Sequence, residues 1–201
     1  YNADAISPQQ RAYNLTPHFV YMAYFSPAHL KVGISSETRG IERLLEQGAR
    51  VAGILKRYAN ADEARSLEAK LCAQEGILET MRLGTKNKLL REPFDARAAM
   101  DCVLETARAH GVEPECGVLD LTPYYFGEGA QVPELIQLPD GSPSDACAGR
   151  CVGMVGGTLA LEQDGNVFAV PVKDWESHAV EITVGEVLVE YEYEPQQMGL
   201  W

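Results

Sequence analysis

The hydrophobic pattern of the chain changes near residue 115, and this change constrains the fold more than any other feature. Before it, strand-like apolar runs alternate with runs that have helical spacing. After it, short apolar runs follow one another, separated by turn residues such as Asp164-Gly165. The charge changes at the same place: residues 1–110 carry 15 basic and 13 acidic side chains, whereas residues 111–201 carry 2 and 16. The sequence therefore predicts two units with different surfaces.

These patterns predict an α+β chain in three segments: a polar, irregular arm over 1–17, a mixed unit over 18–112 and an acidic all-β unit over 113–201. The apolar runs of the third segment indicate a small antiparallel barrel or sandwich, with strands that include HAVEI and GEVLVEYEYE. In the mixed unit we expect strands over 19–25, 30–34 and 50–57 and helices over 41–48, 62–76 and 95–111.

Composition excludes several classes of protein. With 46% hydrophobic and 23% charged residues, the chain of 201 residues is ordinary globular material. No apolar run approaches the roughly 18–20 residues that span a bilayer, and no signal peptide opens the chain. The five cysteines form no tight framework, which favours a reducing compartment. We therefore expect a cytoplasmic protein without membrane contact.

Two stretches indicate a family. PHFVYMAYFSPAHLKVGISSETRGIERLLEQGA (17–49) and GMVGGTLALEQDGNVFAVPV (153–172) resemble the bacterial family of unknown function DUF2797. More distantly, two strand motifs followed by a helix with arginine and a helix with glutamate are similar to the GIY-YIG nuclease-like superfamily. The resemblance implies an N-terminal ββαβα unit. DUF2797 relatives tend to have a cysteine-rich segment before the first motif, and because it is absent here no zinc site is expected in this chain.

The superfamily resemblance also implies a chemistry and its residues. Members cleave phosphodiesters with one divalent metal, here Mg²⁺ or Mn²⁺, because a cation and a guanidinium stabilise the negative charge that develops on the phosphate oxygens. Tyr21 matches the tyrosine of the first motif, and Lys31 stands where the second motif has its tyrosine. Arg43 matches the catalytic arginine, and Glu68 matches the glutamate that holds the metal.

The chain departs from the superfamily pattern at several positions. Lys31 is a poor general base unless burial lowers its pKa. Arg39 is the alternative to Arg43, which follows the second motif by a long loop. Gln47 falls where many relatives have histidine, and Glu63 is the nearest acidic alternative on the later helix.

Each candidate also has a purely structural interpretation. A tyrosine on a strand usually packs in the core, and a lysine at a strand edge is usually solvated. Charged residues one turn apart on a helix often pair with each other. The pairs to consider are Arg43 with Glu46 and Arg65 with Glu68.

A local basic cluster follows the helix with glutamate. Its charged and amide side chains would suit contacts to a phosphate backbone, although a solvated surface loop is the simpler explanation. The predicted nucleic-acid-binding residues are Arg82, Lys86, Asn87, Lys88 and Arg91.

Three functions follow from these observations. The first is a metal-dependent nuclease that acts through Glu68, Arg43, Tyr21 and Lys31. The second is a binding module that has lost hydrolysis and takes nucleic acid or a phosphorylated ligand, which the changes at Lys31 and Gln47 favour. The third is an interaction or regulatory protein whose acidic half engages a basic protein partner.

Overall fold

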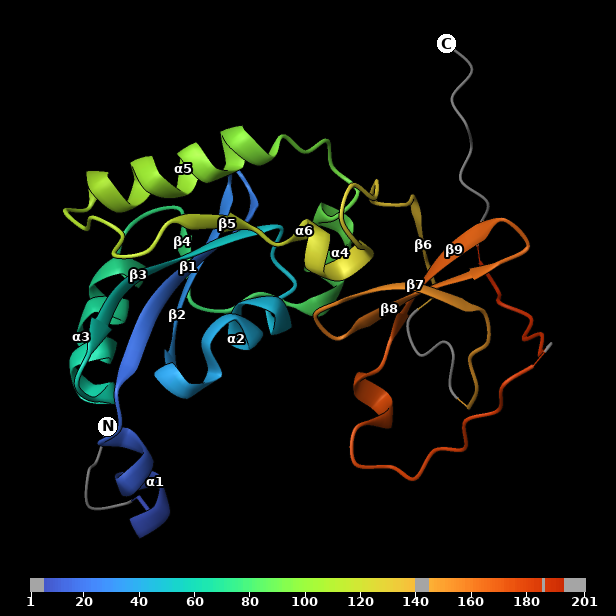
Figure 1. Cartoon of the computed structure of the whole chain (residues 1–201), viewed down its shortest axis with the longest axis horizontal. Helices are drawn as coiled ribbons and strands as arrows, with labels where there is room; N and C mark the ends of the chain where they lie inside the picture. Colours follow the sequence, from blue (N-terminus) through green and yellow to red (C-terminus); the bar gives the residue numbers. More distant parts are fainter. Residues whose placement is uncertain (1–5, 140–144, 186, 194–201) are drawn as a thin grey trace.

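The computed structural model describes residues 6–139, 145–185 and 187–193, and its two sheets with flanking helices confirm the α+β class (Figure 1). The first sheet has the order β4-β2-β1-β3-β5 and the second β6-β9-β8-β7. The strands are β1 (His18–Ser26), β2 (His29–Ser36), β3 (Val51–Tyr58), β4 (Ile77–Leu78), β5 (Val118–Asp120), β6 (Leu135–Gln137), β7 (Arg150–Val155), β8 (Thr158–Gln163) and β9 (Asn166–Pro171). The helices are α1 (Pro8–Asn14), η2 (Glu37–Arg39), α2 (Gly40–Glu46), α3 (Ala61–Cys72), α4 (Leu83–Leu89), α5 (Ala96–Ala109), α6 (Thr122–Phe126) and η3 (Lys173–Trp175).

The centre of the first sheet is β1, an almost continuously apolar strand. Antiparallel neighbours flank it on both sides, β2 in a hairpin and β3 on the opposite edge. All its residues except Tyr24 are buried, because helices cover both faces of the sheet. This explains why the sequence reads as an apolar run there and not as an alternating pattern.

The two faces of β1 belong to different hydrophobic clusters. Val20 and Met22 pack with α3 and α5 on one face. Phe19, Tyr21 and Ala23 pack on the other face with residues of α2, α4, α6 and the second sheet. Figure 1 shows α5 above the sheet and α2 below it, with α4 and α6 between the two sheets. Tyr21 is therefore on the face that the second half of the chain adjoins.

Capping residues set the beginnings of the main helices. The side chain of Asn60 accepts a hydrogen bond from the backbone of Glu63 at 2.9 Å and donates one to its carboxylate at 2.8 Å, which forms a reciprocal cap for α3. Asp95 caps α5 through the backbone of Ala98 at 2.9 Å. These caps fix the start of the two helices that cover the Val20 face.

Two features join the second sheet to the first unit. Gly48, after α2, and Gly156, between β7 and β8, approach so closely that a Cβ on Gly156 would lie 3.2 Å from the Cα of Gly48. Both glycines have positive φ, which a side chain would make costly. In addition, Tyr125 of α6 donates a hydrogen bond to the carbonyl of Ala49 at 2.8 Å.

The expected elements of the mixed unit are confirmed with small shifts at their ends. Other expectations need correction. The irregular arm contains α1, which Ser7 caps through the backbone of Gln10. The HAVEI and GEVLVEYEYE runs form no strand in their described residues, where many apolar side chains are exposed. The second sheet is open, with β6 parallel to β9, and is neither a barrel nor a two-layer sandwich.

Strand β5 lies within the acidic segment of the sequence but pairs with β3 of the first sheet. The first sheet therefore includes a strand from beyond residue 112, the expected boundary between the two units. Among the described residues, no helix is long and apolar enough to cross a bilayer.

Candidate functional site

The site is built around Tyr21, whose ring lies across Gly33 on the neighbouring strand. The register places the two residues opposite each other. A Cβ at position 33 would lie 2.5 Å from the Tyr21 hydroxyl oxygen and 2.7 Å from Cζ, so only glycine leaves room for this ring. Phe19 holds the ring from the side, with centroids 6.2 Å apart in an edge-on arrangement. The glycine of the second motif thus positions the tyrosine of the first.

Arg43 of α2 faces the Tyr21 hydroxyl. Tyr21 Oη and Arg43 Nε are both buried and form no hydrogen bond of normal geometry among the described residues, but the Arg43 side chain is close enough that weak hydrogen bonding to it lowers the pKa of Tyr21. Burial raises the pKa of Tyr21, and the positive charge of Arg43 opposes that rise. Glu46 contacts Arg43 at 3.4 Å and also pairs with Arg39. The expected Arg43–Glu46 pair is therefore present, but the charge of Arg43 still lowers the pKa of Tyr21.

Lys31 extends the same face of the sheet. It pairs with Ala23 in the hairpin, two residues along from Tyr21. Its ammonium nitrogen lies 5.7 Å from the centroid of the Tyr21 ring, and the residue is almost fully buried. Burial and the charge of Arg43 lower the pKa of Lys31 below that of an exposed lysine. Lys31 is therefore not a solvated edge residue.

Glu68 reaches the group from α3. Strand β4 pairs with β2 only at Leu30 and Lys31. Further along β2, the backbone of Ile34 donates a hydrogen bond to the half-buried carboxylate of Glu68. Burial and then the nearby charge of Glu79 raise its pKa, whereas Lys31 lowers it. The carboxylate therefore lies within electrostatic reach of Lys31 and Tyr21.

The alternative partner of Glu68 is engaged elsewhere. Arg65 forms an ion pair with Asp62 at 2.9 Å, and its side chain also contacts Asn14. Its charge lowers the pKa of Glu68 only as a minor contribution. Among the described residues there is no cluster of three or more His, Cys, Asp or Glu that could hold a metal. The carboxylates of Glu68 and Glu79 both act on Lys31 through their charge.

Lys86 joins this group from α4. Its ammonium donates a hydrogen bond to the carbonyl of Gln47 at 2.7 Å and lies 5.2 Å from the ring centroid of Phe25. Burial and the charges of Lys31 and Arg43 lower its pKa to about 8. Lys86, which was predicted as part of the basic cluster, thus lies within electrostatic reach of Lys31 and Arg43.

The remaining members of the basic cluster lie in different environments. Asn87 is buried, and its side-chain amide hydrogen-bonds the hydroxyl of Thr158 in β8 at 3.0 Å, so it ties α4 to the second sheet. Arg82, Lys88 and Arg91 are exposed around α4. A phosphate strip would therefore be limited to these three side chains at the surface, with Lys86 turned toward the site.

Sequence analysis did not single out Glu79. It follows β4, and its charge acts on Glu68 and Lys31. Two residues in a parallel pairing give no periodic signal, so the strand that brings Glu79 here cannot be identified from its sequence alone.

The molecule is thus an α+β protein in which Tyr21 and Lys31 lie on one face of the central hairpin with Arg43, while the charge of Glu68 reaches them from α3. The sequence model of a family described as "protein of unknown function (DUF2797)" matches residues 7–180. The chain belongs to the DUF2797 family. No curated protein and no solved structure gives a significant match.

Proposed function

We propose that the protein is a metal-dependent phosphodiesterase of GIY-YIG-like type that acts on nucleic acid. One observation supports this above all: the ammonium of Lys31 lies 5.7 Å from the centroid of the Tyr21 ring, and the charges of Arg43 and of Glu68, from a separate helix, act on both residues. Chance packing rarely gathers a buried lysine and a half-buried arginine around a fully buried tyrosine. The gathered cations complement a phosphate group.

The shifted pKa values assign roles within this proposal. Tyr21 has a raised pKa and stays protonated, so its hydroxyl orients the attacking water. Burial and the charge of Arg43 lower the pKa of Lys31 and so raise the fraction of its neutral amine; that neutral form takes the proton from the water and passes it to the leaving oxygen. The water oxygen bonds to phosphorus as the bond to the leaving oxygen breaks. Arg43 and Lys86 balance the negative charge on the other phosphate oxygens.

The carboxylates suit a hard divalent cation. Glu68 is half-buried, and the charge of Glu79 disfavours its ionisation, which a bound cation would reverse. Mg²⁺ binds through one or two carboxylates and keeps several waters, so this donor set is sufficient. When bound, the cation would polarise the phosphate and lower the pKa of its water.

The test combines metal titration with cleavage assays. We expect wild-type protein to bind Mn²⁺ by calorimetry and to cleave duplex, single-stranded or branched DNA or RNA. Glu68→Gln should lose the metal heat, and Arg43→Ala should lower the cleavage rate about 100-fold or more. The matched control is Glu75→Gln, an exposed glutamate just after the same helix, which should behave as wild type. Absence of cleavage with both Mg²⁺ and Mn²⁺ on all these substrates would refute the enzymatic proposal.

A second function is favoured by the charge balance of the site. Glu46 pairs with Arg39 and Arg43. With that pair included, four cations face three carboxylates, and Gln47 is a buried amide that cannot transfer a proton at neutral pH. We therefore propose, as the alternative, a module that binds nucleic acid or a phosphorylated ligand without hydrolysis. Binding by filter retention should then weaken with salt, and Lys86→Gln should reduce the salt slope by about 1.

Partners and location complete the proposal. The exposed Arg82, Lys88 and Arg91 would contact a nucleic-acid backbone near the site. The acidic half would bind a basic protein partner, which calorimetry with a lysine-rich peptide at low and high salt tests. All five cysteines are free, which supports a reducing, cytoplasmic location.

A further inference from the structure

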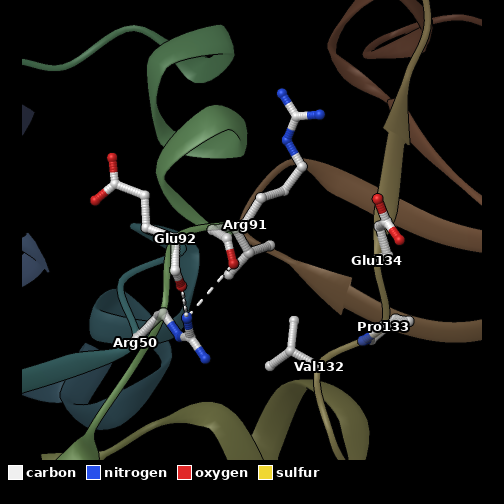
Figure 2. Close-up of a pocket in the computed structure, with 7 residues that line it drawn as sticks. Arg50, Arg91, Glu92, Val132, Pro133 and Glu134 are labelled. Atoms are coloured by element: carbon white, nitrogen blue, oxygen red, sulfur yellow. Dashed lines mark hydrogen bonds between the residues drawn. The ribbon is translucent and has the colours of Figure 1, made fainter. Parts of the chain in front are cut away.

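A separate cavity of about 470 Å³ lies between the end of α4 and the segment that leads into β6. None of Tyr21, Lys31, Arg43 and Glu68 lines it. Its walls combine apolar and charged side chains (Figure 2). The lining residues are Arg50, Leu90, Arg91, Glu92, Val132, Pro133 and Glu134.

Arg50 is held rigidly at the base of this cavity. The residue is only 8% exposed. Its Nη1 donates hydrogen bonds to the carbonyl of Leu90 at 3.4 Å and to that of Glu92 at 3.2 Å. The guanidinium also stacks on Phe94, with its carbon 3.7 Å from the ring centroid. The orientation of the guanidinium is therefore set before any ligand arrives.

The charge of Arg50 is not neutralised by a direct partner. Among the described residues no carboxylate forms an ion pair with it, and its Nε is buried without a hydrogen-bond acceptor. The carboxylate of Glu92 points away from it in Figure 2, and Asp120 acts on it only through its charge. Burial lowers the pKa of Arg50 to about 10, so it remains a cation at neutral pH. A buried cation without a counterion is costly.

The cavity provides the place for that counterion. Figure 2 shows the guanidinium end of Arg50 directed across the cavity toward Val132. The volume is within the range of small-molecule sites, which combine an apolar lining with a few fixed polar groups. Val132, Pro133 and Leu90 form the apolar part of the wall.

We propose that this cavity binds a small organic anion, whose carboxylate or phosphate pairs with the guanidinium of Arg50 while its apolar part contacts Val132 and Pro133. This site is independent of the proposed phosphodiesterase chemistry. Because the walls come from both α4 and the segment before β6, the bound anion joins the first unit to the second sheet. Binding therefore stabilises the folded protein.

Two probes with the same apolar ring test the site, phenyl phosphate and phenylacetate. Each is titrated into ¹⁵N-labelled protein, and the arginine Nε–H resonances and the thermal midpoint are followed. We expect one probe or both to shift the Arg50 Nε–H resonance saturably, with Kd of about 1 mM or tighter, and to raise the midpoint. The stronger probe identifies the head group. If neither probe moves that resonance or the midpoint, the proposal is wrong.

Variants assign the effect to the cavity. Arg50→Met should weaken binding about tenfold or more, because it removes the buried donor. Val132→Asp keeps the contacts of Arg50 with the backbone and adds a competing carboxylate, so it should weaken binding even if Arg50→Met folds poorly. Arg97→Met removes an exposed arginine from α5 and is the matched control. Equal binding by the control and both cavity variants would overturn the assignment.

Discussion

The two sheets of this protein bury similar apolar sequences in different ways. Helices cover both faces of the first sheet, and β1 is buried along almost its whole length. The second sheet is smaller, and its edge strand β7 is mostly exposed. Residues 1–110, which include most of the first sheet, carry 15 of the 17 cations of the chain, whereas the second half is acidic. Regular packing and candidate chemistry therefore occur together in the first unit.

The largest expected difference between the sheets is the loss in the free energy of unfolding when a core leucine is truncated to alanine. Leu55 in β3 is fully buried, so Leu55→Ala should lower the free energy of unfolding by about 2–5 kcal/mol. Leu161 in β8 belongs to a smaller cluster, and Leu161→Ala should cost about 2 kcal/mol. Urea unfolding followed by circular dichroism measures both. If Leu161→Ala instead produces a separate early transition, the two sheets unfold independently.

This contrast also explains how far the sequence could be interpreted. The strands and helices of the first unit have clear periods and caps, as at Asn60 and Asp95, and they were predicted nearly to their ends. The apolar run around Ile182 has strand propensity but pairs with no strand in the part of the chain that the structure describes, because pairing is decided by the tertiary structure. Propensity alone could not reveal that absence.

The candidate site shows the same limit. The motif order singled out Tyr21, Lys31, Arg43 and Glu68, and the structure brings them within electrostatic reach of one another. Lys86 was assigned to a surface cluster, because nothing local shows that α4 turns its side chain inward. Its approach to Gln47 depends on a contact across 39 residues of sequence.

The next prediction tests whether Gly33 positions Tyr21. Gly33→Ala places a Cβ 2.5 Å from the Tyr21 hydroxyl, so the ring must move, and we expect a loss of about 1–3 kcal/mol. The control is Gly157→Ala in the second sheet region, where the new Cβ meets only Leu83 at 4.0 Å. That change should stay within about 0.5 kcal/mol. Equal losses in chemical denaturation would show that room for the ring is not the reason for Gly33.

A substitution at the junction of the two units should lower the free energy of unfolding less than Gly33→Ala does. Gly156→Ala puts a Cβ 3.1 Å from the carbonyl of Glu46 at a positive φ, for an expected loss of about 1–2 kcal/mol. If the junction couples the units, calorimetry will show one transition at a lower temperature. Two transitions in the variant and one in the wild type would mean that this contact alone couples them.

A pH series examines Lys86, a half-buried cation of the first unit. Lys86 has a folded pKa of about 8 against its ordinary value of 10.5, so between these values the unfolded chain binds more protons. Stability therefore gains from this group as pH rises through that window, and below pH 8 the burial cost is fully present. The stability of wild type relative to Lys86→Met should increase between pH 7 and pH 9.5, measured by urea unfolding. Lys88→Met, on the exposed side of α4, should leave the wild-type slope unchanged.

The smallest effect is expected in the acidic half. Arg150 is one of its two cations and pairs with Glu162 across β7 and β8, where the two residues are opposite in register. The arginine side chain is largely exposed, so Arg150→Gln should cost about 0–1 kcal/mol. The loss should grow at low ionic strength, because removing a cation from an acidic surface increases repulsion that salt otherwise screens. A loss that is the same at low and high salt would show that the ion pair stabilises β7 through local contacts, and that the acidity of this half has little influence on its fold.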